Sequence, residues 1–144
     1  MNPTERRNAR HYALQAMYQW QLSDTPVNEI ESEFLFRQIK KKVDLEYFKE
    51  LIHAIPSMAD ELDNHMIPFL SRPIQELDPI ELAILRLSIY ELSYRSDIPY
   101  RVTINEALEM TKKFGSVEGY KFVNGILDKI ARKLRPHEVA AGKK

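Results

Sequence analysis

The fold is decided by residues 78–92, DPIELAILRLSIYEL. Asp78 is placed as an N-cap, Pro79 at the first helical position and Glu81 at the third, which together mark the start of a helix. The apolar residues that follow cover most of the circumference of that helix. Because a helix that is apolar on most sides is buried on most sides, the stretch predicts the central helix of the fold.

Apolar residues recur at helical spacing on both sides of this central segment, and no segment alternates as a strand does. The pattern predicts further helices over residues 3–22, 24–39, 44–55, 57–69, 103–114 and 116–135. Pro56 is expected to interrupt the chain between two of them. Thr103 and Glu106 resemble a capping box, Gly115 is placed to end that helix in a left-handed conformation, and Ser116 is placed to cap the next. We therefore predict an all-α fold of about seven helices in two small packed bundles.

The best candidate for a boundary between the bundles is Ser71-Arg72-Pro73, because a residue that precedes proline is disfavoured in a helix. It divides the chain into an N-terminal lobe, 1–71, and a C-terminal lobe, 72–144. Together the lobes are expected to form one domain. A polar tail is expected from His137 to Lys144.

Length and composition limit the class of protein. The chain has 144 residues, of which 44% are hydrophobic and 29% charged, so we expect a single globular domain with a real core. It has no cysteine, which excludes disulfides, thiolate metal sites and cysteine nucleophiles. There is no apolar run of about 18 residues and no secretion signal, which favours a cytoplasmic protein without a membrane partner.

Motifs for catalysis and cofactor binding are missing. The four histidines, at positions 11, 53, 65 and 137, lack the spacing of helical metal ligands. No phosphate-binding glycine loop, dinucleotide fingerprint or hydrolase elbow is present. The sequence thus predicts no enzyme, no metal site and no cofactor.

Positive charge is clustered although 21 basic residues balance 21 acidic ones. Arg6, Arg7 and Arg10 lie near the start of the first helix, where each cation is unfavourable by about 0.3 to 1 kcal/mol. That placement suggests an anionic partner. Tyr18 shares a helical face with Arg7, so these residues could clamp phosphates and stack on a base of single-stranded nucleic acid. The alternative is that Tyr18 is a half-buried core residue.

Two further groups of residues are of interest. Lys112 and Lys113, and the group Lys129, Arg132, Lys133 and Arg135, end helices, where either the helix dipole or a ligand could explain them. Three of the four glycines lie in residues 114–125, FGSVEGYKFVNG. Glycine within a helix costs about 1 kcal/mol relative to alanine, which suggests a close approach by another backbone or a ligand.

Five stretches resemble the NusB family of bacterial transcription antitermination factors, in one register over residues 3–135. They are RRNAR (6–10), QAMYQ (15–19), LRLSIYEL (85–92), PYRVTINEA (99–107) and KFVNGILDK (121–129). The resemblance implies a non-catalytic protein that binds the single-stranded boxA RNA of nascent ribosomal-RNA transcripts. It implies that the ribosomal protein NusE binds alongside, within the transcription elongation complex.

The resemblance also implies the site residues. The RNA-binding residues would be Arg6, Arg7, Arg10, Tyr18, Phe114 and Lys121. Glu81 and Arg86, on the helix that begins after Asp78, would contact NusE. The same helical module occurs in an RNA cytosine methyltransferase, but the missing cysteine disfavours that enzyme. A helical protein–protein adapter without direct RNA contact remains the alternative.

Overall fold

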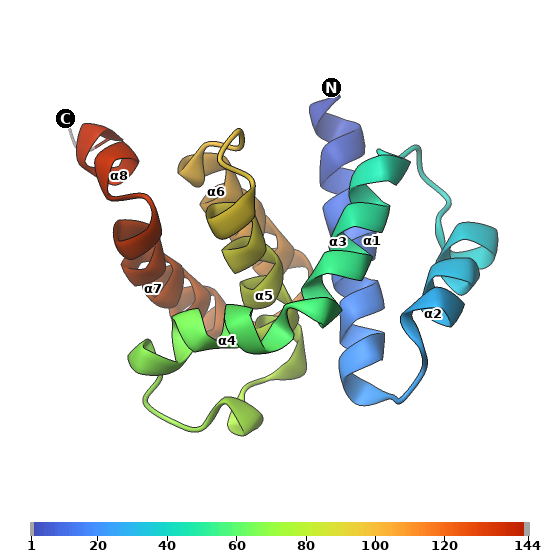
Figure 1. Ribbon diagram of the computed structural model, residues 1–144, viewed down its shortest axis with the longest axis horizontal. Coiled ribbons are helices and arrows are strands. Elements are labelled where there is room, and N and C mark those ends of the chain that lie inside the picture. Colours follow the sequence, from blue (N-terminus) through green and yellow to red (C-terminus); the bar gives the residue numbers. More distant parts are fainter. Residues whose placement is uncertain (1, 143–144) are drawn as a thin grey trace. The chain divides into compact units, whose positions relative to one another are not determined.

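All regular structure is helical in the computed structural model, which describes residues 2–142. Its eight α-helices (Figure 1) are α1 (Pro3–Leu22), α2 (Val27–Glu33), α3 (Leu45–Ser57), α4 (Ala59–Met66), α5 (Pro79–Tyr94), α6 (Tyr100–Phe114), α7 (Val117–Leu134) and α8 (Pro136–Gly142). A π-helical turn, η1 (Phe34–Gln38), and two 3-10 turns, η2 (Ile67–Phe69) and η3 (Ile74–Glu76), join them. The all-α class is confirmed, with one α-helix more in the described range than the approximate count predicted.

The first of two compact units ends at Ala59, and in it α1 packs along α3 (Figure 1). The side chain of Asn2 caps α1 by accepting hydrogen bonds from the backbone N–H groups of Thr4, at 2.9 Å, and Glu5, at 3.2 Å. Asp44 caps α3 by accepting from the N–H of Tyr47 at 3.0 Å. The core between the helices includes Ala9, Ala13, Met17, Phe48, Leu51, Ile52 and Ile55, all fully buried.

The second unit begins at Asp60 and is centred on α5, which packs against both α6 and α7. Asp78 caps α5 as predicted, accepting from the N–H groups of Ile80, at 2.8 Å, and Glu81, at 3.1 Å. The buried apolar residues of this helix are Ala83, Ile84, Leu85, Leu87, Ile89, Tyr90 and Leu92. The prediction of a buried central helix is confirmed.

The division between the units lies after Ala59, the first residue of α4, which is earlier than the boundary predicted at Ser71. The reason is that polar side chains of α4 bind α5. Arg86 donates two hydrogen bonds to Asp63, at 2.9 and 2.7 Å, and the hydroxyl of Tyr94 donates to the carboxylate of Glu61. The Ser71-Arg72-Pro73 turn is therefore internal to the second unit.

Several helix ends differ from the prediction. α6 begins at Tyr100, and the hydroxyl of Thr103 does not cap it but donates to Glu91 at 2.8 Å. Gly115 has a φ of −115°, so it is not left-handed, although Ser116 caps α7 as expected by accepting from the N–H of Gly119 at 3.0 Å. α3 continues through Pro56 to Ser57 instead of ending before the proline.

The expected polar tail is helical as far as residue 142, and its last two residues, 143 and 144, lie outside the described range. α8 is held because Glu138 accepts a hydrogen bond from the backbone N–H of Tyr100 at 2.7 Å. Val139 is buried. The sequence pattern missed this helix because it has only one buried apolar side chain.

Candidate nucleic-acid interface

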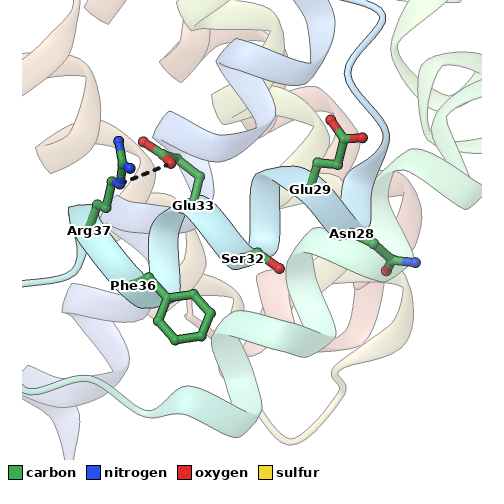
Figure 2. A pocket seen from close by; sticks show the side chains of 6 residues that line it. All are labelled: Asn28, Glu29, Ser32, Glu33, Phe36 and Arg37. Carbon is green, nitrogen blue, oxygen red and sulfur yellow. Dashed lines mark ion pairs between the residues drawn. The ribbon is translucent and has the colours of Figure 1, made fainter.

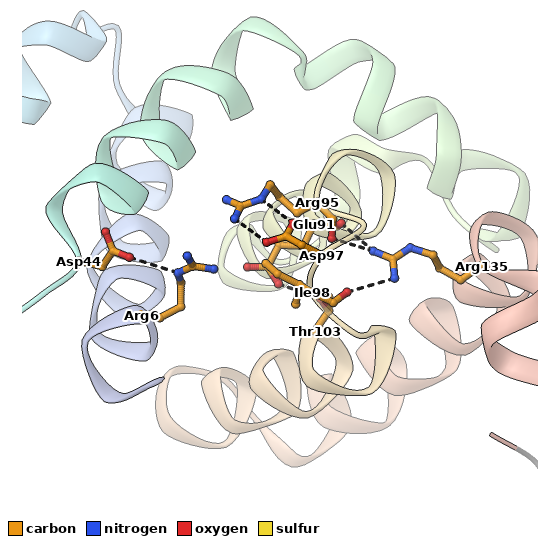
Figure 3. Close-up of polar contacts among 8 residues, drawn as sticks. All are labelled: Arg6, Asp44, Glu91, Arg95, Asp97, Ile98, Thr103 and Arg135. Carbon is orange, nitrogen blue, oxygen red and sulfur yellow. Dashed lines mark hydrogen bonds and ion pairs between the residues drawn. The ribbon is translucent and has the colours of Figure 1, made fainter. Parts of the chain in front are cut away.

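Arg6 is directed into the first unit by its ion pair with Asp44. Nε of Arg6 lies 3.4 Å from Oδ2 of Asp44 (Figure 3), and the guanidinium lies 4.0 Å from the centroid of the Tyr47 ring. Only 7% of Arg6 is exposed. An arginine near a helix N-terminus suggested an external anion, and here a carboxylate of the neighbouring helix supplies the negative charge.

The other predicted residues of α1 differ in exposure. Arg10 is 3% exposed and its guanidinium lies 5.7 Å from the same Tyr47 ring. Arg7 is exposed and Tyr18 is half-buried. Of the three arginines, Arg7 thus offers the most accessible charge, while Arg6 and Arg10 help to stabilise the contact between α1 and α3.

The turn between α6 and α7, in the second unit, forms a hollow with a basic and aromatic lining. The hollow has a volume of about 460 Å³ and is lined by Thr111, Lys112, Gly115, Ser116, Val117, Tyr120 and Lys121. Nζ of Lys112 lies 5.6 Å from the centroid of the Tyr120 ring, close enough for a cation–π interaction. Val117 is 72% exposed, so the lining also includes an accessible apolar surface.

Both predicted RNA-binding residues of the second unit lie at this turn. Lys121 is exposed and lines the hollow, and Phe114 is half-buried with Nζ of Lys113 5.4 Å from its ring centroid. Tyr120 and Lys112, which also line the hollow, are not among the predicted site residues. Their signal was present in the sequence, since Tyr120 stands within the glycine-rich stretch and Lys112 ends the preceding helix.

The carboxylate of Glu81 approaches Gly119 closely, as the position of this glycine within a helix suggested. A Cβ at this residue would lie 2.5 Å from Oε2 of Glu81. Burial raises the pKa of the Glu81 carboxyl and Asp78 raises it further, while Arg72 lowers it in part. Gly125 is different, because a Cβ there would meet no atom within 4 Å. The cost of glycine in the helix therefore has a steric explanation only at Gly119.

The two residues predicted to contact NusE are both held within the second unit. Glu81 is 8% exposed, and the Arg86 guanidinium is engaged with Asp63. Five residues apart on α5, they point about 140° away from each other. A partner that contacts one of them would reach the other only by wrapping around the helix.

Arg135 is held by contacts within the second unit, whereas Lys129, Arg132 and Lys133 of the same basic group are exposed. Its guanidinium donates to the carbonyl oxygens of Glu91, in α5, and of Arg95 and Ile98, in the loop between α5 and α6 (Figure 3). It also donates to the carbonyl of Leu92 and the carboxylate of Glu138. Arg132 pairs with Asp128 at 3.2 Å on the exposed face of the same helix.

Within residues 2–142, no helix is both long and apolar enough to cross a bilayer, and no histidine and carboxylate side chains gather as metal ligands would.

Comparisons with known proteins agree in one family. The family model described as NusB family matches residues 7–132. The chain is 52% identical over 137 residues to the transcription antitermination protein NusB of Baumannia cicadellinicola subsp. Homalodisca coagulata, covering 95% of this chain and 99% of that protein. It is 50% identical over 135 residues to the protein of the same name from Shewanella halifaxensis (strain HAW-EB4), covering 94% and 100%.

Solved structures match over a similar extent. One is a crystal structure of the antitermination factors NusB and NusE in complex with dsRNA, with a TM-score of 0.81, 27% identity and coverage of 92% of this chain and 99% of that chain. Another is T. maritima NusB, with a TM-score of 0.77, 28% identity and coverage of 93% and 96%.

Proposed function

Because the chain belongs to the NusB family, we propose that it is a transcription antitermination factor that binds single-stranded boxA RNA of nascent ribosomal-RNA transcripts. It acts without catalysis, in the cytoplasm, as part of the elongation complex and together with the ribosomal protein NusE. The relative solved with NusE holds dsRNA, so the preference for a single strand is part of the proposal and has to be tested.

The observation that carries RNA binding is the hollow at the α6–α7 turn. It combines two lysines with an aromatic ring and an exposed valine, the combination that binds a backbone phosphate and stacks on an unpaired base. Phe114 extends the aromatic surface on the same turn. On α1, Arg7 and Tyr18 are proposed as direct contacts, whereas Arg6 and Arg10 are proposed to act mainly by adding positive potential near the surface.

The first prediction concerns RNA affinity measured by fluorescence anisotropy with a short boxA-like strand. Lys121→Ala is expected to weaken binding, and the slope of log affinity against log salt should become shallower by about 0.7, the value for one phosphate contact on a single strand. Lys129→Ala is the matched control, because Lys129 is an exposed lysine of α7 that does not line the hollow. Its affinity and slope should equal those of the unchanged protein.

The same titration separates the alternatives. Equal binding to the strand and to its duplex would contradict the preference for single-stranded RNA. If Lys121→Ala and Lys129→Ala change the salt slope equally, the α6–α7 hollow is not part of the RNA interface. Absence of binding to either RNA would favour the adapter without RNA contact.

The second prediction concerns NusE, for which the start of α5 is the proposed docking surface. Glu76, Asp78 and Glu81 give it an acidic character that suits a basic ribosomal protein. Arg86 is retained as a proposed contact farther along the helix. In calorimetric titration, Glu76→Lys and Glu81→Lys should each weaken NusE binding. Exposed Glu76 is the cleaner probe, because Glu81 lies against Gly119 and its substitution also needs an unfolding control.

Linkage provides the check on the joint complex. Whatever factor NusE adds to the affinity for boxA RNA, the RNA must add to the affinity for NusE. If NusE binds with the same heat and affinity to the unchanged chain and to Glu76→Lys, its interface lies elsewhere. If NusE binds neither protein, with or without RNA, the joint mechanism is wrong.

A further inference from the structure

The loop between η1 and α3 (residues 39–44, the lysine loop) carries three consecutive lysines. Lys40, Lys41 and Lys42 are all exposed. Ammonium groups so close in the sequence repel one another, and in a loop no helix dipole offsets the repulsion. Their charge would be stabilised by an anion, either from the chain or from outside it.

Only one of these lysines has an acidic partner within residues 2–142. Nζ of Lys42 lies 3.8 Å from Oε2 of Glu5, whereas the other two lysines form no ion pair. Arg37, the cation that precedes the loop, is also compensated, because Figure 2 shows its guanidinium directed toward Glu33, with Nε 3.8 Å from Oε2. Two cations of the lysine loop therefore remain available to an external anion.

The backbone of the lysine loop is fixed to α1. The hydroxyl of Tyr12 accepts hydrogen bonds from the N–H groups of Lys40, at 3.1 Å, and Lys41, at 3.3 Å. Nδ2 of Asn8 donates to the carbonyl oxygen of Lys42 at 2.9 Å. The two lysines without an ion pair thus project from a backbone held in one position, which lowers the entropy cost of binding a ligand.

This attachment places the lysine loop at one edge of the exposed face of α1. Asn8 lies about 100° around the helix from Arg7, and Tyr12 lies about 120° from Tyr18. Gln15, which is exposed, lies between these two rows. A strand on this face would therefore meet Arg7 and Tyr18 at one edge and the lysine loop at the other.

We propose, resting on the proposed function, that the lysine loop binds phosphate groups of the same RNA strand that contacts Arg7 and Tyr18. Lys40 and Lys41 contact the phosphates, and Tyr12 is a positioning residue that holds their backbone. An RNA strand is favoured because the other edge of the face offers an arginine and an aromatic ring, which suit a nucleotide. Phosphate contacts raise affinity without reading the base sequence.

The test is fluorescence anisotropy with a boxA-like strand that has several additional nucleotides at each end. Lys40→Ala with Lys41→Ala should weaken binding and make the slope of log affinity against log salt shallower by about 1.4, the value for two phosphate contacts on a single strand. The matched control is Arg37→Ala with Lys49→Ala, which removes the same charge from exposed positions of the same unit outside the lysine loop. The control should keep the slope of the unchanged chain.

A further variant tests the position of the loop separately from its charge. Tyr12→Phe keeps every lysine but removes the hydroxyl that accepts from the loop, so it should weaken RNA binding in the otherwise unchanged chain. Added to Lys40→Ala with Lys41→Ala, it should have no further effect, because the two ammonium groups that it positions are already gone. An unfolding curve checks that Tyr12→Phe is folded.

Lysine acetylation gives a direct readout of the contact. Bound RNA should protect Lys40 and Lys41 from an N-hydroxysuccinimide ester of acetate, as measured by mass spectrometry. Lys49, which is exposed on α3, should react at the same rate with and without RNA.

The outcomes separate the lysine loop from the proposed function. If the unchanged chain binds no RNA, the proposed function is wrong and the phosphate contacts are wrong with it. If it binds RNA but both pairs of alanine substitutions change the slope equally, or RNA leaves Lys40 and Lys41 unprotected, the lysine loop is not a contact. Equal weakening by Tyr12→Phe with and without the two lysines overturns the positioning role.

Discussion

Arg135→Ala is expected to lower the free energy of unfolding by about 3–5 kcal/mol, because two buried carbonyl oxygens and the carboxylate of Glu138 lose the hydrogen bonds of the guanidinium. All five N–H donors of the guanidinium are used, and the side chain is only 9% exposed. The acceptors are the carbonyl oxygens of Glu91, Leu92, Arg95 and Ile98 and the carboxylate of Glu138. Alanine would leave the buried carbonyl groups of Leu92 and Ile98 without this donor, whereas those of Glu91 and Arg95 keep the backbone N–H groups of Arg95 and Ile98 as donors.

The effect is large because Arg135 joins the end of α5, the loop before α6 and α8. Leu92 is in the last turn of α5, where carbonyl groups lack a partner within the helix, and Glu91 accepts from Arg135 in addition to the N–H of the C-cap residue Arg95. Burial alone would raise the pKa of Glu138, but the hydrogen bonds from Tyr100 and Arg135 lower it. Glu138 therefore remains an anion that holds Arg135 in place.

Denaturant unfolding measures the predicted loss. Arg132→Ala is the matched control, because Arg132 lies on the same helix, is 55% exposed and pairs only with Asp128 among the ion pairs described. Its effect should lie within about 0.5 kcal/mol of zero. Arg135→Lys should behave more like alanine than like arginine, since an ammonium keeps the charge but lacks the fork of donors. Equal effects of Arg135→Ala and Arg132→Ala would contradict this account.

Arg135 also illustrates why charge clustering in the sequence was an ambiguous signal. Lys129, Arg132, Lys133 and Arg135 form one basic group at the end of α7, and the helix dipole and an external anion explain such a group equally well. Arg135 instead contacts residues about forty positions earlier in the chain. Arg6 likewise forms an ion pair with a residue far away in the sequence, Asp44. Contacts between residues so far apart in the sequence depend on the folded topology, which the spacing of apolar residues does not reveal.

Local signals were more informative. The caps at Asp78 and Ser116 involve hydrogen bonds to residues two or three positions away, so the residue types alone predict them. The capping box at Thr103 failed because Glu91, on another helix, offers a buried acceptor. The α6–α7 turn was recognised from its glycines. The hollow itself was not, since its lining depends on how Tyr120 and Lys112 meet across the turn.

Asp63→Ala is the second substitution expected to have a large effect, again about 3–5 kcal/mol in the free energy of unfolding. The Asp63 and Arg86 side chains are 11% and 12% exposed, and they share two hydrogen bonds of 2.7 and 2.9 Å in a bidentate pair. Alanine leaves the Arg86 guanidinium largely buried and without this carboxylate. Asp60→Ala, at an exposed position of the same helix, is the control and should change stability little.

The Asp63 variant also tests where the chain divides. If α4 belongs to the unit centred on α5, the loss of this pair should increase amide hydrogen exchange in α4 and α5 together, while α1 and α3 keep their protection. Increased exchange confined to α1 and α3 would place α4 with the N-terminal lobe, as the boundary predicted near Ser71 requires. Replacing both partners, as Asp63→Leu with Arg86→Met, should recover much of the stability, because no buried charge then lacks its partner. A double variant as unstable as Asp63→Ala would show that the pair acts through packing rather than charge.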